Sequence, residues 1–367
     1  MLLPPEITTP ALVVDQVRLE RNLAEMAASA EARGLCLRPH AKTHKTAQIG
    51  RRQLDLGATG LTVATIGEAE AFAAAAVTDL FVAYPLWPSR ARLGRLRTLA
   101  EQVQLRLAVD SATSAAELAP LSRCTRPPQV LVEIDSGHHR TGVQPGQAGE
   151  VALAAARAGL TVAGVFTFPG HSYAPGARET AAAQEATALS AAAASLEAAG
   201  LADGGSGSGR SRERSGGSTP TAFERAEPPL TELRPGVYVF NDAQQLELGV
   251  CRSDQIALAA AATVVSRPAR GRLVLDCGSK VLGADRQPWS SGFGRLPGWP
   301  EARIVALSEH HATVTLPAGS AVPELGEVVA VVPNHVCSAV NLADNLLVIR
   351  DGAVIDTWPI MARGANS

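Results

Sequence analysis

Short apolar runs alternate with alanine-rich amphipathic stretches over the first two thirds of the chain. The apolar runs predict strands, and each is followed by a stretch with helical periodicity. Because the runs are apolar almost throughout, they indicate parallel strands that are buried on both faces of a sheet. The predicted strands are Leu35–Lys42, Leu61–Ile66, Leu80–Pro85, Leu105–Asp110, Val130–Asp135 and Val162–Phe168. The predicted helices are Ala47–Leu56, Ile66–Ala76, Ser89–Glu101, Ser111–Leu118, Gly146–Ala158 and Ala177–Ala199.

Two more strands complete a set of eight, the number that closes a (β/α)8 barrel. One is predicted at Val237–Asn241 and one is expected near residues 207–217, so the barrel covers residues 10–245. A doubly wound open sheet is the alternative, but the chain has no dinucleotide-binding fingerprint. Residues 203–218 read DGGSGSGRSRERSGGS, which is typical of a flexible segment. Either the seventh strand is short and polar, or part of this segment is an insertion ahead of it.

The pattern changes at about residue 246, where β-like runs are separated by Gly, Pro and Asp. The runs are Ala257–Ser266, Arg272–Asp276, Ile304–Ser308, Ala312–Leu316, Glu327–Val332, Asn345–Arg350 and Ala353–Trp358. Asp351-Gly352 is a signal for a two-residue hairpin turn. We therefore expect an all-β domain over residues 246–367, with residues 1–9 packing on it.

Composition excludes several classes of function. Hydrophobic residues make up 46% and charged residues 19% of the chain, as in soluble enzymes. The net charge of -2 gives no reason to expect binding to nucleic acid or to an anionic membrane. No apolar run reaches the roughly 18 residues of a membrane span, and no signal peptide is recognised at the N-terminus. Five scattered cysteines fit a reducing cytoplasm, where we expect the protein.

Lysine is nearly absent from the chain. Lys42, Lys45 and Lys280 are the three lysines among 33 basic residues, and two of them lie in the segment RPHAKTHKT. Arginine stays charged and cannot form a Schiff base, whereas lysine can lose its proton and act as nucleophile or base. The segment closes an apolar run and precedes a helical one, which predicts a strand-to-helix turn that carries a reactive lysine.

Six motifs in order resemble those of a known enzyme family. They are RPHAKTHKT, EIDSGHHRTG (Glu133–Gly142), FPGHSY (Phe168–Tyr173), SGGSTPT (Ser215–Thr221), LRPGVYVFND (Leu233–Asp242) and VPNHVCSAVNL (Val332–Leu342). The set resembles the D-serine dehydratase and D-threonine aldolase family, and the resemblance covers nearly the whole chain. It implies a pyridoxal 5'-phosphate (PLP) enzyme of the alanine-racemase fold type. The implied architecture is α/β: a PLP-binding (β/α)8 barrel followed by an all-β C-terminal domain, in a homodimer.

The resemblance assigns roles to several residues of the barrel. Lys42 resembles the lysine that forms the Schiff base with PLP, at the end of the first barrel strand, and Lys45 is the alternative. Arg140 resembles an arginine beside the phenolic oxygen of PLP. Tyr173 resembles a tyrosine near the cofactor ring, and His171 is either an acid–base group or a support for Tyr173.

Two glycine-rich segments are candidates for the phosphate site. A phosphate needs backbone donors without steric bulk, and in barrels it commonly binds after the seventh and eighth strands. The candidates for cofactor binding there are Gly217, Ser218, Thr219, Gly236, Val237 and Tyr238.

His335 and Cys337 are a candidate metal pair. On an extended segment, residues two apart point to the same side, so imidazole and thiolate could bind one ion. This ligand set suits Zn2+, with positions left open for water or substrate, and another divalent metal is the alternative. Within VPNHVCSAVNL, the pair resembles the dehydratase metal site.

The leading functional hypothesis is a PLP- and zinc-dependent lyase of the ammonia-lyase type. It eliminates water from a small D-3-hydroxy amino acid, D-serine or D-threo-3-hydroxyaspartate, to give a 2-oxo acid and ammonia. The first alternative is a D-threonine aldolase that gives glycine and an aldehyde; the family's aldolases tend to carry a carboxylate where this chain has Cys337. A racemase would need a tyrosine from the β-domain, and Tyr84, Tyr173 and Tyr238 all precede it. A non-catalytic PLP carrier would lack the β-domain and the metal motif.

Overall fold

The computed structural model describes residues 1–201, 212–224 and 230–367. These residues form two compact units, which we call the β unit and the barrel unit. The β unit contains Met1–Met26, Thr43–Gln48 and Val237–Gly364, and the barrel unit contains Ala27–Lys42, Ile49–Gly236 and Ala365–Ser367. The chain therefore leaves the barrel unit after Lys42 for a short segment and then returns to it. The predicted division at residue 246 stays a prediction.

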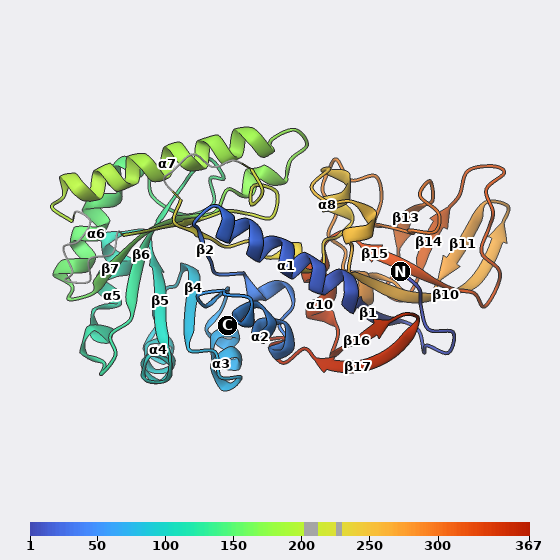
Figure 1. Ribbon diagram of the computed structural model, residues 1–367, viewed down its shortest axis with the longest axis horizontal. Coiled ribbons are helices and arrows are strands. Elements are labelled where there is room, and N and C mark those ends of the chain that lie inside the picture. The colour runs from blue at the N-terminus through green and yellow to red at the C-terminus, as the bar shows by residue number, and fades with distance from the viewer. Residues whose placement is uncertain (202–211, 225–229) are drawn as a thin grey trace. The chain divides into compact units, whose positions relative to one another are not determined.

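Eight parallel strands form the sheet of the barrel unit, with helices on its outer face (Figure 1). Their order is β2-β9-β8-β7-β6-β5-β4-β3. The strands are β2 (Cys36–Leu37), β3 (Leu61–Val63), β4 (Asp79–Pro85), β5 (Gln104–Val109), β6 (Gln129–Ile134), β7 (Thr161–Thr167), β8 (Glu213–Gly216) and β9 (Glu232–Leu233). The first and last strands of this order meet, because Thr62 pairs with His40 and donates its N–H to the Pro39 carbonyl over 2.8 Å. The predicted α/β barrel architecture is confirmed.

Helices follow the strands at the predicted places. They are α2 (Ala47–Asp55), α3 (Ile66–Ala74), α4 (Arg90–Gln102), α5 (Ala112–Glu117), α6 (Ala148–Arg157) and α7 (Arg178–Ala198), and α1 (Gln16–Ala32) precedes the first barrel strand. The start of α3 shows why the sequence is helical there: the Thr65 hydroxyl accepts from the N–H of Glu68 over 3.0 Å. The Glu68 carboxylate in turn accepts from the N–H of Ala64, so the first turn is capped from both sides.

Two predicted strands are wrong in extent or position. The run Leu35–Lys42 is a strand only at Cys36–Leu37, and Lys42 lies in a 3-10 turn, η1 (Ala41–Thr43), instead of ending the strand. The run Val237–Asn241 contains a buried 3-10 helix, η5 (Val237–Val239). The eighth strand is β9, which precedes it and has only two residues. An apolar-run criterion cannot detect a strand as short as Glu-Leu.

The seventh strand lies within the expected range, at β8. The rest of the predicted flexible segment, residues 203–211, lies outside the described residues. Strand β8 carries glutamate and arginine because its ends meet polar surroundings. Its Glu213 and Arg214 are half-buried, whereas Ser215 and Gly216 are buried.

The barrel interior is filled by aromatic rings around one cation. The rings of Phe81 and Phe166 meet edge to face with centroids 5.0 Å apart. The guanidinium of Arg234 lies 5.4 and 5.0 Å from the two centroids. It donates to the Thr167 carbonyl over 2.6 Å, so this buried charge is held by a hydrogen bond and two ring faces.

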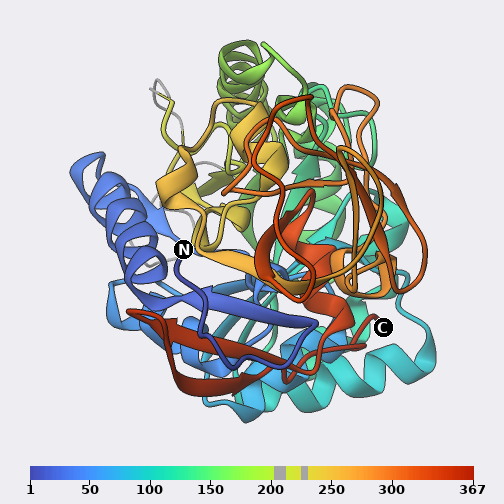
Figure 2. The same ribbon diagram turned by 90° about the vertical axis from the view of Figure 1, so that its right-hand side faces the viewer.

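A nine-stranded sheet forms the β unit. Strand β1 (Ala11–Asp15), from the N-terminal end of the chain, lies between strands from its C-terminal part. It pairs antiparallel with β10 (Leu258–Ala269) and parallel with β16 (Asn345–Arg350) (Figure 2). The other strands are β11 (Arg272–Leu275), β12 (Gly294–Arg295), β13 (Arg303–Leu307), β14 (Ala312–Thr315), β15 (Val328–Pro333) and β17 (Ala353–Pro359). Short helices α8 (Ala243–Glu247), α9 (Ser279–Leu282) and α10 (Val336–Leu342) interrupt them.

Each β-like run predicted for this part of the sequence overlaps an observed strand. The Asp351-Gly352 turn joins β16 to β17 with φ of 51° and 79°, the left-handed values that a type I′ hairpin requires. Met1, Leu3 and Ile7 pack against a buried cluster that includes Val13. This packing explains why the first residues belong to the β unit.

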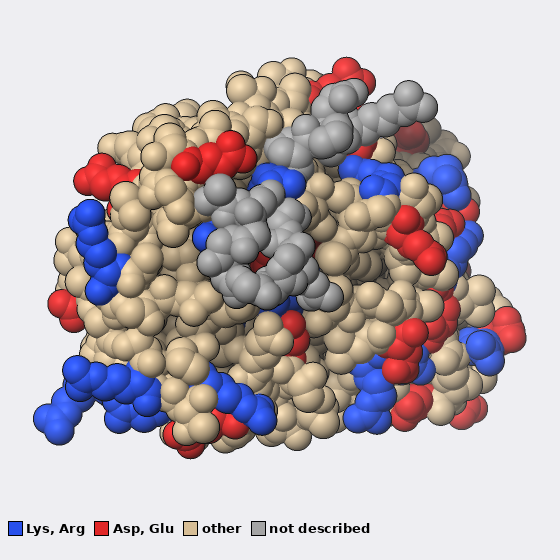
Figure 3. Space-filling view, turned by 60° about the vertical axis from the view of Figure 1, so that its left-hand side comes forward, with Lys and Arg blue, Asp and Glu red and all other residues tan. Residues whose placement is uncertain are grey.

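Charged side chains are dispersed over the surface. On the face drawn in Figure 3, basic and acidic side chains form small groups of both signs among uncharged ones. No helix in the described parts of the chain has the length and apolarity of a membrane span.

Candidate active site

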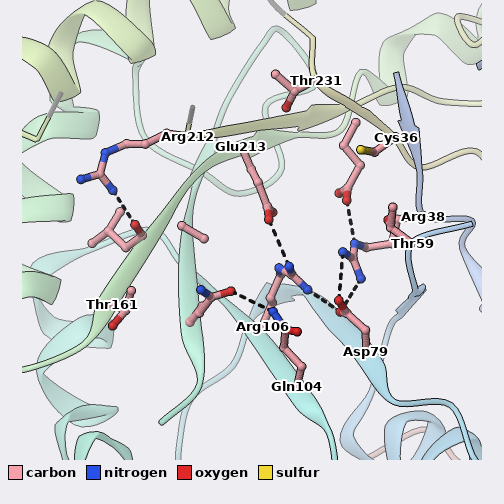
Figure 4. Close-up of a pocket in the computed structure, with 14 residues that line it drawn as sticks. Cys36, Arg38, Thr59, Asp79, Gln104, Arg106, Thr161, Arg212, Glu213 and Thr231 are labelled. Atoms are coloured by element: carbon pink, nitrogen blue, oxygen red, sulfur yellow. Dashed lines mark hydrogen bonds and ion pairs between the residues drawn. The ribbon is translucent and has the colours of Figure 1, made fainter. Parts of the chain in front are cut away.

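The amino-terminal end of the barrel contains a polar cavity of about 720 Å³ (Figure 4). Arg38 donates to Glu232 over 2.8 Å and to Asp79 over 2.6 Å. Arg106 pairs with the same Asp79 and with Glu213, the latter over 3.1 Å. Burial would lower the pKa of Arg38, but Glu232 and Asp79 raise it above its ordinary value. Since these cations and carboxylates pair with one another, we interpret this end as structural.

Three predicted site residues meet at the carboxyl-terminal end, around the ring of Phe168. The Lys42 ammonium lies 5.8 Å from the ring centroid and the Arg140 guanidinium lies 5.2 Å from it. The ring of Tyr173 is tilted against Phe168 at 6.3 Å. Carboxyl-terminal strand ends carry the active sites of barrel enzymes, so this group, the Phe168 cluster, is our candidate active site.

Lys45 has a structural role within the β unit. Its side chain is buried, and its ammonium donates to the Asn341 side chain over 2.7 Å and to the Ala362 carbonyl over 3.4 Å. These contacts tie the segment Thr43–Gln48 to α10 and to the C-terminal residues of the β unit. This observation favours Lys42 over Lys45 as the reactive lysine.

The loop that carries Arg140 is shaped by one carboxylate. Asp135 accepts from the N–H groups of Gly137 and His139 over 2.9 and 3.0 Å. Burial would raise the pKa of Asp135, but these bonds and the His139 side chain lower it. Gly142 has φ of 98°, and a side chain there would meet the backbone of Asp135. The glycines of EIDSGHHRTG are therefore required by the turn that presents Arg140.

His138 belongs to the Phe168 cluster although the sequence analysis did not select it. Its ring packs edge-on against Phe168, with centroids 5.5 Å apart. Burial and the nearby Arg140 lower its pKa, which favours a neutral imidazole. Three histidines in FPGHSY and EIDSGHHRTG look alike in sequence, and no pattern distinguishes the one that faces the aromatic ring.

His171 and Tyr173 diverge although both lie in the 3-10 turn η4 (Gly170–Tyr173). The His171 ring is 2.8 Å from the side-chain oxygen of Gln184 on α7, whereas Tyr173 contacts Phe168. The structure thus connects Tyr173 with the cluster and His171 with a neighbouring helix. The prediction that His171 takes part in catalysis stays a prediction.

The loop after β8 is a glycine turn that carries buried hydroxyl groups. Gly217 has φ of 86°, and a Cβ there would lie 2.9 Å from the Leu233 side chain, so only glycine fits. The hydroxyl-bearing residues Ser218, Thr219 and Thr221 are all buried. The N–H of Ser218 donates to the Thr221 hydroxyl over 3.0 Å, which tightens the turn. Buried hydroxyls on a glycine turn at this barrel position fit the phosphate of PLP.

The second glycine segment follows the adjacent strand. The N–H of Arg234 donates to the Gly216 carbonyl over 2.8 Å, so the ends of β8 and β9 remain paired. Gly236 ends the barrel segment, and Val237 and Tyr238 begin η5. Tyr238, counted with the barrel in the sequence analysis, belongs to the β unit and is buried. Phosphate binding by this segment stays a prediction.

The candidate metal pair lies at a helix start and not on an extended segment. His335 is the N-cap of α10 and Cys337 is in its first turn. The fully buried carboxylate of Asp242 lies 3.6 Å from Nδ1 of His335 and accepts from the N–H of Val336 over 3.2 Å. The Cys337 sulfur lies 3.4 Å from the hydroxyl of Thr43, the residue that follows Lys42 in the chain.

Electrostatics link these two side chains. Burial would lower the pKa of His335, but Cys337 and Asp242 raise it well above its ordinary value. A metal-binding imidazole commonly turns its second nitrogen to a carboxylate, as His335 does toward Asp242. Within the described ranges, no three His, Cys, Asp or Glu side chains form a group that could hold a metal ion. The pair fits an open site, in which water or substrate supplies the remaining ligands.

Comparison with known proteins identifies both parts of the chain. Residues 14–244 match the family "Alanine racemase, N-terminal domain", and residues 257–349 match "Putative serine dehydratase domain". The D-threonine aldolase of Arthrobacter sp. is 34% identical, over 98% of this chain and 93% of its own. The D-threo-3-hydroxyaspartate dehydratase of Delftia sp. is 33% identical, over 90% of this chain and 91% of its own.

Solved structures show the same relationship. The D-threonine aldolase of Filomicrobium marinum superposes with a TM-score of 0.87 at 31% identity, over 100% of this chain and 99% of its own. Structures of a D-threo-3-hydroxyaspartate dehydratase include a histidine-to-alanine variant and a metal-free variant in which a cysteine two positions further on is alanine. The chain described here belongs to the alanine racemase N-terminal domain family of PLP enzymes, and it is related to D-threonine aldolase and D-threo-3-hydroxyaspartate dehydratase.

Proposed function

We propose that the protein is a PLP- and zinc-dependent lyase that eliminates water from D-3-hydroxy amino acids. The released enamine would then take up one water and hydrolyse to a 2-oxo acid and ammonia. The observation that carries this proposal is the pairing of His335 with Cys337, with the buried Asp242 behind the imidazole. The histidine and cysteine substituted in the dehydratase structures have the same spacing, which supports a metal site of the dehydratase kind.

The Phe168 cluster supplies the groups that would bind the cofactor. PLP, when bound, withdraws electrons from the α-carbon of an amino acid. Lys42 Nζ would hold the cofactor and then take the α-proton once the substrate amine has replaced it. Arg140 would keep the phenolic oxygen ionised, because its guanidinium lies near the same Phe168 ring as the Lys42 ammonium. Tyr173, packed on the same ring, would limit the movement of the cofactor.

His335 and Cys337 would hold the zinc ion. The ion would act as a Lewis acid on the β-hydroxyl of the substrate and make it a better leaving group. Asp242 orients His335, since it is buried and its other oxygen accepts from the N–H of Gln245 over 2.9 Å. Cys337 contacts the hydroxyl of Thr43 over 3.4 Å, and Thr43 is the residue that follows Lys42 in the chain.

A D-threonine aldolase is the second candidate, because an aldolase and a dehydratase resemble this chain to the same degree. The Arthrobacter aldolase is as similar to this chain, at 34% identity, as the Delftia dehydratase at 33%. Overall similarity therefore does not choose between the reactions. We favour dehydration because of Cys337, since the resemblance assigns a carboxylate to the aldolases at this position.

D-Threonine distinguishes the two candidates, because both reactions can act on it. The experiment incubates the purified protein with PLP, zinc and D-threonine and identifies the products. We expect 2-oxobutyrate and ammonia. Glycine and acetaldehyde would instead establish the aldolase. Absence of any product from D-threonine, D-serine and D-threo-3-hydroxyaspartate would refute both.

The metal role is tested by His335→Ala. We expect the variant to lose elimination and zinc content while it retains the visible absorbance of the lysine-bound cofactor. The matched control is His310→Ala, because His310 is exposed in the same unit. Full activity of the wild-type protein after exhaustive chelation would overturn the zinc role.

A further inference from the structure

Glu185 is a buried carboxyl group that the proposed reaction does not use. It lies on α7, and 1% of its surface is exposed. Its Oε1 accepts from the N–H of Gly217 over 2.6 Å. Gly216 also lies against Glu185: a side chain at this position would collide with the same carboxyl oxygen. Glu185 therefore reaches the first residues of the loop that we propose for the cofactor phosphate.

This contact determines how the loop leaves β8. The peptide between Gly216 and Gly217 turns its N–H inward, to Glu185, and the chain then enters the turn that buries Ser218 and Thr219. The Ser218 hydroxyl is held 2.8 Å from that of Ser172, in the loop after β7. Glu185 and Ser172 thus both hold the loop after β8 by hydrogen bonds. Of these two side chains, only that of Glu185 can ionise.

The charges around Glu185 do not form an ion pair with it. Arg33, after α1, and Arg234, after β9, are the cations that act on it electrostatically. Each gives its guanidinium to a carbonyl, Arg33 to Ala222 over 2.5 Å and Arg234 to Thr167 over 2.6 Å. Among the described residues, no Lys, Arg or His approaches the Glu185 carboxyl within salt-bridge distance.

Arg234, one of the two cations near Glu185, is itself surrounded by several carboxyl groups. Glu133 and Glu232 act on it as well as Glu185, so its charge is shared among three carboxyls. Burial raises the pKa of Glu185 to about 7, although the Gly217 N–H and the two arginines oppose this. The carboxyl is therefore poised to change its charge near neutral pH.

We propose that Glu185 is a positioning residue for the cofactor phosphate, and that it is protonated when the phosphate is bound. A protonated carboxyl still accepts the Gly217 N–H through its carbonyl oxygen, so the loop keeps its shape. An ionised Glu185 would put a third negative charge beside a phosphate dianion in a buried region, where charges interact more strongly than in water. Phosphate binding thus favours uptake of one proton. The inference rests on the proposed PLP site but not on the reaction.

The test measures binding of PLP and of pyridoxal, which lacks the phosphate, between pH 7 and pH 9. The readout is the visible absorbance of the lysine-bound cofactor in apoprotein. Both compounds share the chemistry at Lys42, so the ratio of their dissociation constants isolates the phosphate. For the wild-type protein we expect the preference for PLP to fall by about fivefold over this range, because a coupling of about one pKa unit from a pKa of about 7 is already half titrated at pH 7.

The variants separate the charge from the hydrogen bond. Glu185→Gln keeps an oxygen that can accept the Gly217 N–H and removes the titration. We expect it to keep the preference for PLP at every pH. Glu185→Ala, which loses the bond, should weaken PLP binding while pyridoxal binding is retained. Glu179→Gln, at an exposed position of the same helix, is the matched control and should behave as the wild type does.

Three results would overturn the inference. One is a pH dependence of the PLP preference that is the same in Glu185→Gln as in the wild type. Another is an equal loss of PLP and pyridoxal in both variants, which would show a purely structural role. A wild-type protein that binds no PLP would reject the cofactor together with this inference. A protein that binds PLP as predicted but turns over no hydroxy amino acid would reject only the proposed reaction.

Discussion

The two ends of the barrel arrange their charges in opposite ways. At the amino-terminal end, Arg38, Arg106, Asp79, Glu213 and Glu232 pair with one another across five strands. At the carboxyl-terminal end, the cations of Lys42 and Arg140 both lie near the ring of Phe168. The same barrel therefore carries a network of paired charges at one end and a cation-rich cluster at the other.

This difference teaches how one scaffold separates stability from function. Paired buried charges hold strand ends together, because removal of one partner leaves an uncompensated buried charge. The cations at the other end lie near an aromatic ring, whose quadrupole attracts positive charge. In barrels, the amino-terminal face is commonly the stabilising one and the carboxyl-terminal face the catalytic one.

The largest expected effect is that of Lys42→Ala. Because Lys42 is proposed both to bind the cofactor and to move the proton, turnover should fall by about 10³-fold or more. The visible absorbance of the bound cofactor should also disappear, while the thermal unfolding midpoint stays close to that of the wild type. Lys280→Ala is the control, because Lys280 forms an exposed pair with Glu309 over 2.8 Å. Retention of the absorbance in Lys42→Ala would move the reactive role to another lysine.

Arg38→Met should have the largest effect on stability. It leaves Glu232 and Asp79 without their shared cation, and breaking a buried pair costs about 3 to 5 kcal/mol. Urea unfolding measures this change in the free energy of unfolding. Arg95→Ala removes an exposed pair with Glu70 and should cost less than about 1 kcal/mol. Equal costs for the two variants would contradict a structural role for the amino-terminal end.

Glu185 should make stability depend on pH. Its folded-state pKa of about 7 is raised above the ordinary value of 4.5, so the folded state retains the proton more strongly. Its stabilising contribution is therefore complete below pH 4.5 and declines by up to about 3 kcal/mol as the pH rises through 7. Glu185→Gln should gain stability relative to the wild type over this interval, in urea unfolding at several pH values. A constant difference between the two proteins would contradict the raised pKa.

Phe168→Leu should have the smallest effect. Loss of the aromatic face should lower kcat/KM by about tenfold, since cation–ring contacts contribute about 1 to 2 kcal/mol. Stability should change by less than about 1.5 kcal/mol, because the side chain is half-buried and the volume is similar. Phe166→Leu, in the barrel core, is the comparison: it should lower stability and leave the activity of the folded protein unchanged. The reverse outcome would place the functional ring inside the barrel.

Sequence reasoning found the parts of the fold whose burial is periodic. The strands of the β unit and the helices of the barrel unit have alternating or helical apolar patterns long enough to recognise. Strand β9 escaped because its two residues, Glu232 and Leu233, are too few to show a period. Strand β1 pairs with β10 and β16, which lie more than 200 residues later in the chain, and a local sequence pattern cannot predict which distant strands will pair.

The candidate site divides in the same way. Rarity and motif order selected Lys42, and spacing selected His335 and Cys337, although their backbone is helical and not extended. Glu185 and Asp242 were missed. In an alanine-rich helix a buried glutamate has the same sequence surroundings as an exposed one, and Asp242 reads as an ordinary helix cap. Only the packing of α7 against the loop after β8 reveals what Glu185 contacts.

The brief excursion of the chain after Lys42 has a consequence for how such proteins can be divided or recombined. Both Met1–Met26 and Thr43–Gln48 belong to the β unit. Barrel segments flank Thr43–Gln48 on both sides. No single cut yields a complete barrel unit and a complete β unit. A fragment that ends at Gly236 would leave Lys45 without Asn341 and β1 without its neighbours. The two units must therefore be expressed as one chain, and one boundary that a fusion of separate units would have to cross directly follows Lys42.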